Sequence, residues 1–348
     1  MNTIDIIDTP IINNNINNTI KEPKTQSISD PLFDESTRRY ALFPIQYHKV
    51  WELYKKQSSC FWRTEEIDFS KDYVDFLKLK PEEQKVLKRV LAFFSGLDGL
   101  VNFNIQQNLI NEFVPLEIQM CYGFQVAIEN IHNETYSVML DNLVKDKSEK
   151  YELLNSLETI PTIIAMKNFG MKYLDKEVPT YDRLIAYACI EGIMFSGAFA
   201  VIFWLKKYYN GLMSGLVKAN EFIARDEGLH VEFASMIHNM MICKSEKDSI
   251  KIIRESVKIA SDFMEEAMEI KLIGMNSMAM NQYIEYVADC LITSLGFKKI
   301  YNVSNPFTFM NTIGMLQKTN MHDSRATEYQ KADLSNADNV FDLSPDDF

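Results

Sequence analysis

The sequence predicts an all-α protein built as a bundle of long helices. From Pro81 onward apolar residues recur at helical spacing for about two hundred residues, and no stretch alternates as a strand does. Pro115, Pro161 and Pro179 each stand where a helix begins rather than in a helix interior. The expected long helices cover residues 82–110, 116–144, 161–173, 181–209, 216–241, 247–278 and 280–297.

The two ends of the chain differ in composition from this helical region. Residues 1–28 are rich in Asn, Ile and Thr without a sustained period, which is typical of a disordered extension. Residues 29–70 mix prolines, charges and aromatics, and we expect an arm that packs on the main body. The acidic, polar residues 331–348 should form a flexible tail. We therefore expect one helical domain over residues 29–330.

Charge and cysteine usage narrow the class of protein. The net charge of −12 and the pI near 5.0, with no basic stripe, argue against a nucleic-acid-binding protein. The five cysteines are scattered, odd in number and without a Cys-x-x-Cys pair, which favours reduced thiols in the cytoplasm over a disulfide framework. The N-terminus shows no secretory pattern of basic and then apolar residues.

One apolar stretch, residues 187–205, is nearly long enough to span a bilayer. Glu191 lies within it, however, and no second comparable segment exists. A helix that is apolar on all sides is also what the centre of a large bundle requires. We therefore expect a buried central helix and no membrane.

The residues most able to bind metal ions occur in one spacing, Glu-x-x-His, which is found twice in the chain. A helix advances about 100° per residue, so Glu129 and His132 lie within roughly 60° of each other on one face. Glu227 and His230 repeat this Glu-x-x-His spacing, and the other three of the five histidines have no glutamate three positions upstream. Two such pairs on two helices form half of the ligand set of a carboxylate-bridged two-metal site in a helical bundle.

Two further acids complete a repeated order. Asp98 and Glu191 each lie in an apolar stripe of the helix that precedes a Glu-x-x-His pair. A carboxylate facing a core is costly unless it is paired, protonated or metal-bound, although one such acid alone could sit partly exposed at the edge of its stripe. Four carboxylates carry a charge of −4, which two divalent ions neutralise. Oxygen and nitrogen ligands without thiolate suit iron or manganese better than structural zinc.

Tyr136 lies on the same helical face as Glu129 and His132. Phe195, Phe199 and Ile223 lie on the faces of the other predicted ligands. A phenol beside an oxidising metal pair and walled by inert side chains could lose an electron and a proton, which would leave a protected radical. Tyr136 could equally be a core tyrosine, and the spacing alone leaves both interpretations open.

Four stretches of the chain resemble a known family. They are FWRTEEIDFSKD (61–72), YGFQVAIENIHNETYS (122–137), EGIMFSGAFAVIFWLKK (191–207) and RDEGLH (225–230), and they are similar to the small, radical-generating (beta) subunit of class I ribonucleotide reductase of the eukaryotic type. The resemblance implies a ferritin-like di-iron helical bundle with additional helices, which forms a homodimer. It also implies two Fe ions per chain, oxo-bridged and diferric when active, with Mn as the alternative metal.

The resemblance also assigns roles to individual residues. One iron would be bound by Asp98, Glu129 and His132, and the other by Glu191, Glu227 and His230. Tyr136 would carry the stable tyrosyl radical in an apolar pocket of Phe195, Phe199 and Ile223. The catalytic relay to the large subunit would use Trp62, Asp226 and Tyr329. The tail would dock on that large subunit through Phe341, Leu343 and Phe348.

The expected function is that of the small subunit of ribonucleoside-diphosphate reductase. Its di-iron centre would activate O₂ to form the radical, and the large subunit would use the radical to reduce ribonucleoside diphosphates to deoxyribonucleotides. In agreement, the chain has no Gly-rich phosphate loop. The alternatives are another di-iron oxidase, an iron-storage protein and a metal-free helical interaction protein. The phase of Tyr136 and the combination of Tyr329 with an acidic tail argue against all three.

Overall fold

The computed structural model describes residues 30–268, 272 and 274–312, and regular structure there is helical apart from one isolated bridge between Leu272 and Met275. The longer helices are α1 (His48–Ser59), α3 (Pro81–Asn104), α5 (Leu116–Leu143), α6 (Lys147–Leu154), α8 (Pro161–Lys172), α9 (Thr180–Cys189), α10 (Phe195–Tyr208), α11 (Ser214–Met240), α12 (Glu246–Ala267) and α13 (Ser277–Ser294). Short helices are α2 (Asp72–Phe76), α4 (Ile110–Glu112) and α7 (Ser156–Thr159). Two π-helical segments, Ile105–Leu109 and Ile190–Met194, interrupt the α-helical geometry.

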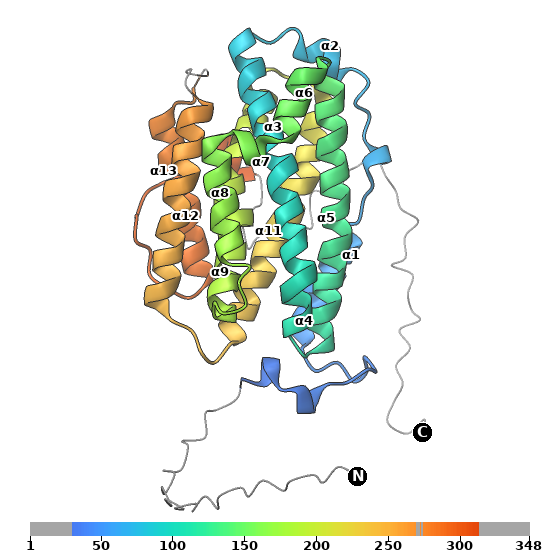
Figure 1. Ribbon diagram of the computed structural model, residues 1–348, viewed down its shortest axis with the longest axis vertical. Helices are drawn as coiled ribbons and strands as arrows, with labels where there is room; N and C mark the ends of the chain where they lie inside the picture. Colours follow the sequence, from blue (N-terminus) through green and yellow to red (C-terminus); the bar gives the residue numbers. More distant parts are fainter. Residues whose placement is uncertain (1–29, 269–271, 273, 313–348) are drawn as a thin grey trace, which may run out of the picture.

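The long helices form a bundle around one hydrophobic core. Helix α3 packs along α5, while α9 packs against α11 and α12 (Figure 1). Helices α12 and α13 pack on each other and flank the bundle on the side away from α5 (Figure 1). One continuous cluster of buried apolar side chains extends from Leu32 to Met310. The described part of the predicted domain over residues 29–330 thus shares a single core.

The most apolar segment lies at the centre of the bundle. Helix α9, the π-helical segment and α10 follow one another over Thr180–Tyr208, long and apolar enough to cross a membrane by length and composition. The whole of its most apolar 18-residue window is buried against the other helices. The prediction of a buried central helix is confirmed.

Most predicted helices agree with the structure within a few residues, but the end of the helix predicted over 247–278 is wrong. Helix α12 ends at Ala267, and α13 begins at Ser277, where the Asn276 side chain accepts a hydrogen bond from the Ala279 amide. Between them Gly274 has a φ of +72°, which favours glycine. A Cβ there would come within 2.2 Å of the Tyr208 hydroxyl. Buried Met264, Met268, Leu272 and Met275 continue the apolar pattern and conceal this break.

The predicted arm over residues 29–70 does pack on the main body, but it contains helix α1, which the sequence pattern did not reveal. Helix α1 lies against α5 and α11. The buried Glu117 carboxylate of α5 holds the segment that precedes α1. It pairs with Arg39 and accepts hydrogen bonds from the backbone amides of Gln46 (2.8 Å) and Tyr47 (3.3 Å). The predicted disordered extension 1–28 and the predicted tail 331–348 lie outside the described residues.

A buried histidine near the end of α11 makes stability depend on pH. His238 has no exposed surface, and its burial, aided by the nearby Lys244 charge, lowers its pKa from 6.5 to about 4. Between these two pH values His238 binds a proton in the unfolded chain but not in the folded chain. The free energy of unfolding therefore falls as the pH falls from 6.5 toward 4. Between pH 7 and pH 4.5, the free energy of unfolding should therefore fall by roughly 2–3 kcal/mol less in His238→Leu than in the wild-type protein. Urea unfolding of metal-free protein at pH 7 and pH 4.5 measures it.

The matched control is His48→Leu, which removes an exposed histidine at the start of α1. This variant should keep the wild-type difference in the free energy of unfolding between the two pH values. Equal pH dependence in His238→Leu and wild-type protein would contradict the assignment to His238.

Candidate metal centre

Six buried side chains from four helical segments converge inside the bundle. Asp98 comes from α3, Glu129 and His132 from α5, Glu191 from the π-helical segment, and Glu227 and His230 from α11. All six have an exposed fraction of 1% or less. Helices α5 and α11 run in opposite directions here, because His132 meets Glu227 while Glu129 meets His230. The fold therefore joins the two Glu-x-x-His pairs face to face.

The two central glutamates each reach both histidines. His132 Nδ1 lies 3.4 Å from Glu129 Oε2 and 3.1 Å from Glu227 Oε1. His230 Nδ1 lies 2.9 Å from Glu129 Oε1 and 3.4 Å from Glu227 Oε2. Each carboxylate thus directs one oxygen to each end of the centre, which is the placement of a bridging ligand. Glu191 Oε2 approaches His230 Nδ1 at 3.5 Å, so Glu191 belongs to that end.

The ligand atoms fit a pair of cations. Both oxygens of Glu129, Glu191, Glu227 and Asp98, and Nδ1 of both histidines, are buried and make no hydrogen bond of acceptable geometry among the described residues. Such atoms are costly to bury unless something else satisfies them. They fall into two groups whose ligand atoms lie within 4.8 Å of one another: Asp98, Glu129 and His132, and Glu129, Glu191, Glu227 and His230. Two divalent ions would neutralise the four carboxylates.

The protonation of this cluster is perturbed in the way that closely packed buried acids and imidazoles require. Burial and the neighbouring Glu129 charge hold the pKa of Asp98 well above its usual value, and burial raises the pKa of Glu191 to about 8. Burial also acts on Glu129, but the adjacent His132 and His230 lower its pKa to about 2. Bound cations can take the place of the protons that buried acids of this kind would otherwise hold.

Tyr136 lies beside the Asp98 end of the cluster in an apolar enclosure. It is fully buried, and its hydroxyl has no hydrogen-bond partner among the described residues. Its ring stacks on Phe94 with the centroids 4.7 Å apart and the planes 5° from parallel. Burial and then the Asp98 charge raise the pKa of Tyr136 well above 10, so the phenol is neutral.

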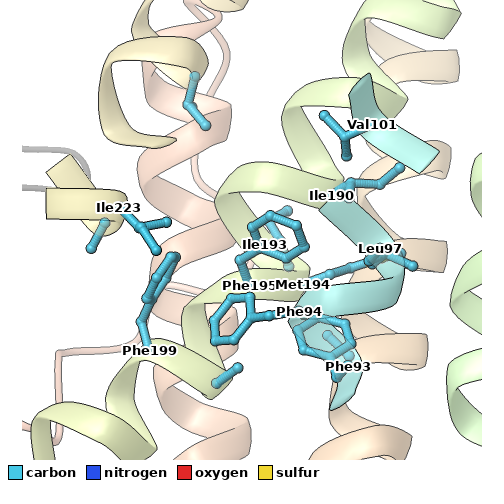
Figure 2. Packing of buried hydrophobic residues seen from close by; sticks show 14 of the residues in the cluster. Phe93, Phe94, Leu97, Val101, Ile190, Ile193, Met194, Phe195, Phe199 and Ile223 are labelled. Carbon is cyan, nitrogen blue, oxygen red and sulfur yellow. The ribbon is translucent and has the colours of Figure 1, made fainter. Parts of the chain in front are cut away.

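The three predicted pocket residues belong to the apolar cluster around this phenol. Phe94 contacts Phe195 (5.3 Å between ring centroids) and Phe199 (4.8 Å). Figure 2 shows these rings from α3 and α10 gathered with Ile223 of α11. Phe94 is the ring that stacks directly on the phenol, and it was not among the predicted pocket residues. Its position four residues before Asp98, on the same face of the helix, was the available signal.

A chain of hydrogen bonds leads outward from His132. Its Nε2 lies 3.3 Å from Asp226 Oδ2, which also accepts a hydrogen bond from Trp62 Nε1 at 2.7 Å. Arg225 donates to the other Asp226 oxygen at 2.8 Å and to the Cys60 carbonyl at 2.7 Å. Burial opposes ionisation of Asp226, but Arg225, His132 and Trp62 keep its pKa below the usual value. The Asp226 carboxylate therefore fixes the His132 ring and leaves Nδ1 free to face the metal centre.

The structure thus brings together all six predicted ligands, and it links Trp62 to His132 through Asp226. Arg225 was missed as the support of Asp226, and its only sequence signal was its adjacency. The predicted relay residue Tyr329 and the docking residues Phe341, Leu343 and Phe348 lie outside the described residues.

Known proteins share this sequence over most of its length. Residues 39–306 match the family described as ribonucleotide reductase, small chain. The ribonucleoside-diphosphate reductase small chain of Vaccinia virus (strain Ankara) is 46% identical over 319 residues, which cover 91% of this chain and 99% of the relative. The ribonucleoside-diphosphate reductase subunit M2 of Homo sapiens is 44% identical over 334 residues, which cover 93% of this chain and 85% of the relative.

Solved structures share the fold. The Rnr4 homodimer of the ribonucleotide reductase from Saccharomyces cerevisiae superposes with a TM-score of 0.73 at 34% identity, over 80% of this chain and 88% of that one. The dimanganese(II)-NrdF of Streptococcus sanguinis has the same fold at 18% identity, with a TM-score of 0.71 over 79% of this chain and 99% of that one. The ferritin-like helical fold predicted from the sequence is confirmed. The chain belongs to the ribonucleotide reductase small chain family.

Proposed function

We propose that this chain is the radical-generating small subunit of a ribonucleoside-diphosphate reductase. The observation that carries the proposal is the convergence of six buried ligand side chains beside a fully buried tyrosine. The relatives from Vaccinia virus and Homo sapiens are both named as subunits of ribonucleoside-diphosphate reductase. The chain would act on ribonucleoside diphosphates only through a large catalytic subunit, because its own chemistry is concentrated in a closed metal centre.

Asp98, Glu129 and His132 would hold one metal ion, and Glu191, Glu227 and His230 the other, with Glu129 and Glu227 in reach of both. A pair of iron ions bound there would reduce O₂ and supply the oxidising equivalent that the phenol needs. Carboxylate oxygens and imidazole nitrogens suit iron and also manganese. The NrdF of Streptococcus sanguinis, which shares the fold, is a dimanganese(II) protein. We propose iron as the working metal and manganese as the alternative.

Tyr136 would carry the radical. Its neutral hydroxyl makes no hydrogen bond to the described residues that would have to be broken. Of the neighbouring charges, the Asp98 carboxylate has the largest effect on the pKa of this hydroxyl. Loss of one electron and one proton from this hydroxyl would leave a phenoxyl radical stacked on Phe94. The enclosure of buried aromatic rings keeps water and reductants away from the ring. The residues around Tyr136 thus support a long-lived radical.

Trp62, Asp226 and His132 would pass the oxidising equivalent outward. Trp62 is 2% exposed, so the relay begins inside the protein and must continue through other residues to reach a partner. We propose Tyr329 as the residue that transfers it to the large subunit, and Phe341, Leu343 and Phe348 as the anchors that dock the tail there.

We further propose that the small subunit works as a homodimer in the cytoplasm. The ribonucleotide reductase protein Rnr4 of Saccharomyces cerevisiae, which is 34% identical to this chain, forms a homodimer. All five cysteines are free thiols, which supports a reducing compartment. The acidic net charge of −12 does not favour nucleic acid as a partner.

Removing one central ligand tests the metal centre. Glu227→Ala should lower the bound iron from two ions per chain to one or none, because Glu227 directs an oxygen to each histidine. Radical formation and reductase activity should fall by more than about 100-fold, since ligation and oxidation both depend on the pair. Metal analysis after anaerobic loading, followed by electron paramagnetic resonance after O₂ addition, measures both effects.

Glu83→Gln is the matched control. Glu83 is also a buried glutamate, but its carboxylate accepts a hydrogen bond from the Tyr209 hydroxyl at 2.8 Å, and it belongs to neither of the two ligand groups found among the described residues. This variant should keep two ions per chain. Retention of two tightly bound ions in Glu227→Ala would contradict the proposed set of metal ligands.

A further inference from the structure

A second buried phenol lies next to the metal centre, on the side away from Tyr136. Tyr187 of α9 is 1% exposed and precedes Glu191 by four residues, so both lie on one helical face. Its hydroxyl donates to Gln125 Oε1 of α5 at 3.2 Å, and Gln125 precedes Glu129 by four residues. The Tyr187–Gln125 pair therefore joins two helices about one turn away from two of the ligands.

The surroundings of the two phenols distinguish the two ends of the centre. Burial and then the charge of Glu191 raise the pKa of Tyr187, whereas burial and then the charge of Asp98 raise the pKa of Tyr136. Tyr187 accordingly stands at the Glu191 end and Tyr136 at the Asp98 end. The proposed function uses only the phenol at the Asp98 end, which leaves Tyr187 without a role.

The hydrogen bonds around Tyr187 are incomplete. A phenol has one proton to donate, and here the proton goes to Gln125. The Gln125 amide nitrogen is buried without a hydrogen-bond partner among the described residues, and neither Glu191 oxygen makes a hydrogen bond of good geometry there. The Tyr187 hydroxyl nevertheless lies close enough to Glu191 for weak hydrogen bonding to this carboxylate to contribute to the raised pKa of Tyr187. A carboxylate that binds a metal through one oxygen leaves its other oxygen in need of a donor. Glu191 also belongs to the π-helical segment, where its backbone departs from regular α-helical geometry.

We propose that Tyr187 is a positioning residue for Glu191. The Tyr187 hydroxyl lies within reach of both Gln125 and Glu191, and it turns fully to the Glu191 carboxylate when a metal ion binds at the His230 end. The inference rests on the proposed metal centre. In the loaded state the Tyr187 hydroxyl donates to the Glu191 carboxylate, and it thereby fixes one orientation of that side chain. Without the metal, the side-chain amide oxygen of Gln125 accepts the hydrogen bond from the Tyr187 hydroxyl. Gln125 is then a competitor of Glu191 for the same proton.

Two substitutions with opposite effects test this arrangement. Anaerobic titration with Mn²⁺ alone, followed by electron paramagnetic resonance of free Mn²⁺, gives the two dissociation constants. In Tyr187→Phe one ion should bind about 10-fold more weakly, because partners of this kind typically contribute 10- to 100-fold to metal affinity, and the other ion should be unaffected. In Gln125→Met the same ion should bind at least as tightly as in the wild-type protein, because the competing acceptor is gone.

Tyr122→Phe is the matched control for Tyr187→Phe. Tyr122 is also fully buried, but its hydroxyl makes no hydrogen bond among the described residues, so both ions should bind as in the wild-type protein. Wild-type affinities in Tyr187→Phe, equal weakening in Tyr187→Phe and Tyr122→Phe, or weaker binding in Gln125→Met would each overturn the inference. Binding of fewer than two ions by the wild-type protein would instead overturn the proposed metal centre, and the inference with it.

Discussion

The Tyr136→Phe variant is expected to bind two metal ions per chain and to form no stable tyrosyl radical. Phenylalanine keeps the ring that stacks on Phe94 and loses only a hydroxyl without a hydrogen-bond partner, so folding and the ligands should be unaffected. The oxidisable O–H is gone, and activity with the large subunit should fall by more than about 1,000-fold, equivalent to at least about 4 kcal/mol of activation free energy. Metal analysis, spin quantitation and a reductase assay measure the three quantities.

Tyr122→Phe serves as the control in this experiment too, because it removes a buried phenol of the same helix that lies outside the proposed radical pocket. It should keep both the radical and the activity. A tyrosyl signal of wild-type shape and intensity in Tyr136→Phe protein would assign the radical to another residue. Loss of the metal along with the radical would show that Tyr136 is needed to build the centre rather than to be oxidised by it.

The fold could be predicted wherever helix ends carry their own signals. Pro81, Pro115 and Pro161 stand at or just before the first residues of helices, and the predicted starts agree with the structure within a residue. The end of α12 could not be predicted, since the apolar spacing continues through a loop whose turn depends on Gly274 and its contact with Tyr208. The π-helical segments could not be predicted either. A π-helical turn contains about one residue more than an α-helical turn, and this hardly changes the spacing of apolar residues in the sequence.

The ligand types could be predicted from spacing, whereas their division between the two metal ions came only from the family resemblance, and spacing gave no sign that Glu129 and Glu227 each reach both histidines. Helical phase shows which face carries Glu129 and Glu227, whereas the reach of each carboxylate to both histidines depends on how α5 crosses α11. The same limit applies to Phe94 and Arg225. Each contacts a predicted residue across or along the bundle, and only the packed structure shows that contact.

The Trp62→Phe variant should separate radical formation from radical transfer. Phenylalanine fills most of the buried site but has no N–H to donate to Asp226, and its ring is harder to oxidise than an indole. Arg225 still holds the other oxygen of Asp226, so the His132 ring should keep its orientation. We expect the Tyr136 radical to form in near wild-type yield while reductase activity falls by more than about 100-fold, or about 3 kcal/mol.

The distinction depends on measuring spin and turnover in the same sample. Trp62 is 2% exposed, so its replacement should leave the affinity for the large subunit unchanged, and a binding measurement checks that the loss of turnover is not a loss of docking. Trp204→Phe is the control, because it removes another buried indole, on α10, and should retain activity. If activity in Trp62→Phe falls only in proportion to the radical, Trp62 supports the metal centre. If activity stays at the wild-type level, the oxidising equivalent leaves the centre by another route, and the hydrogen bond from Trp62 to Asp226 serves packing alone.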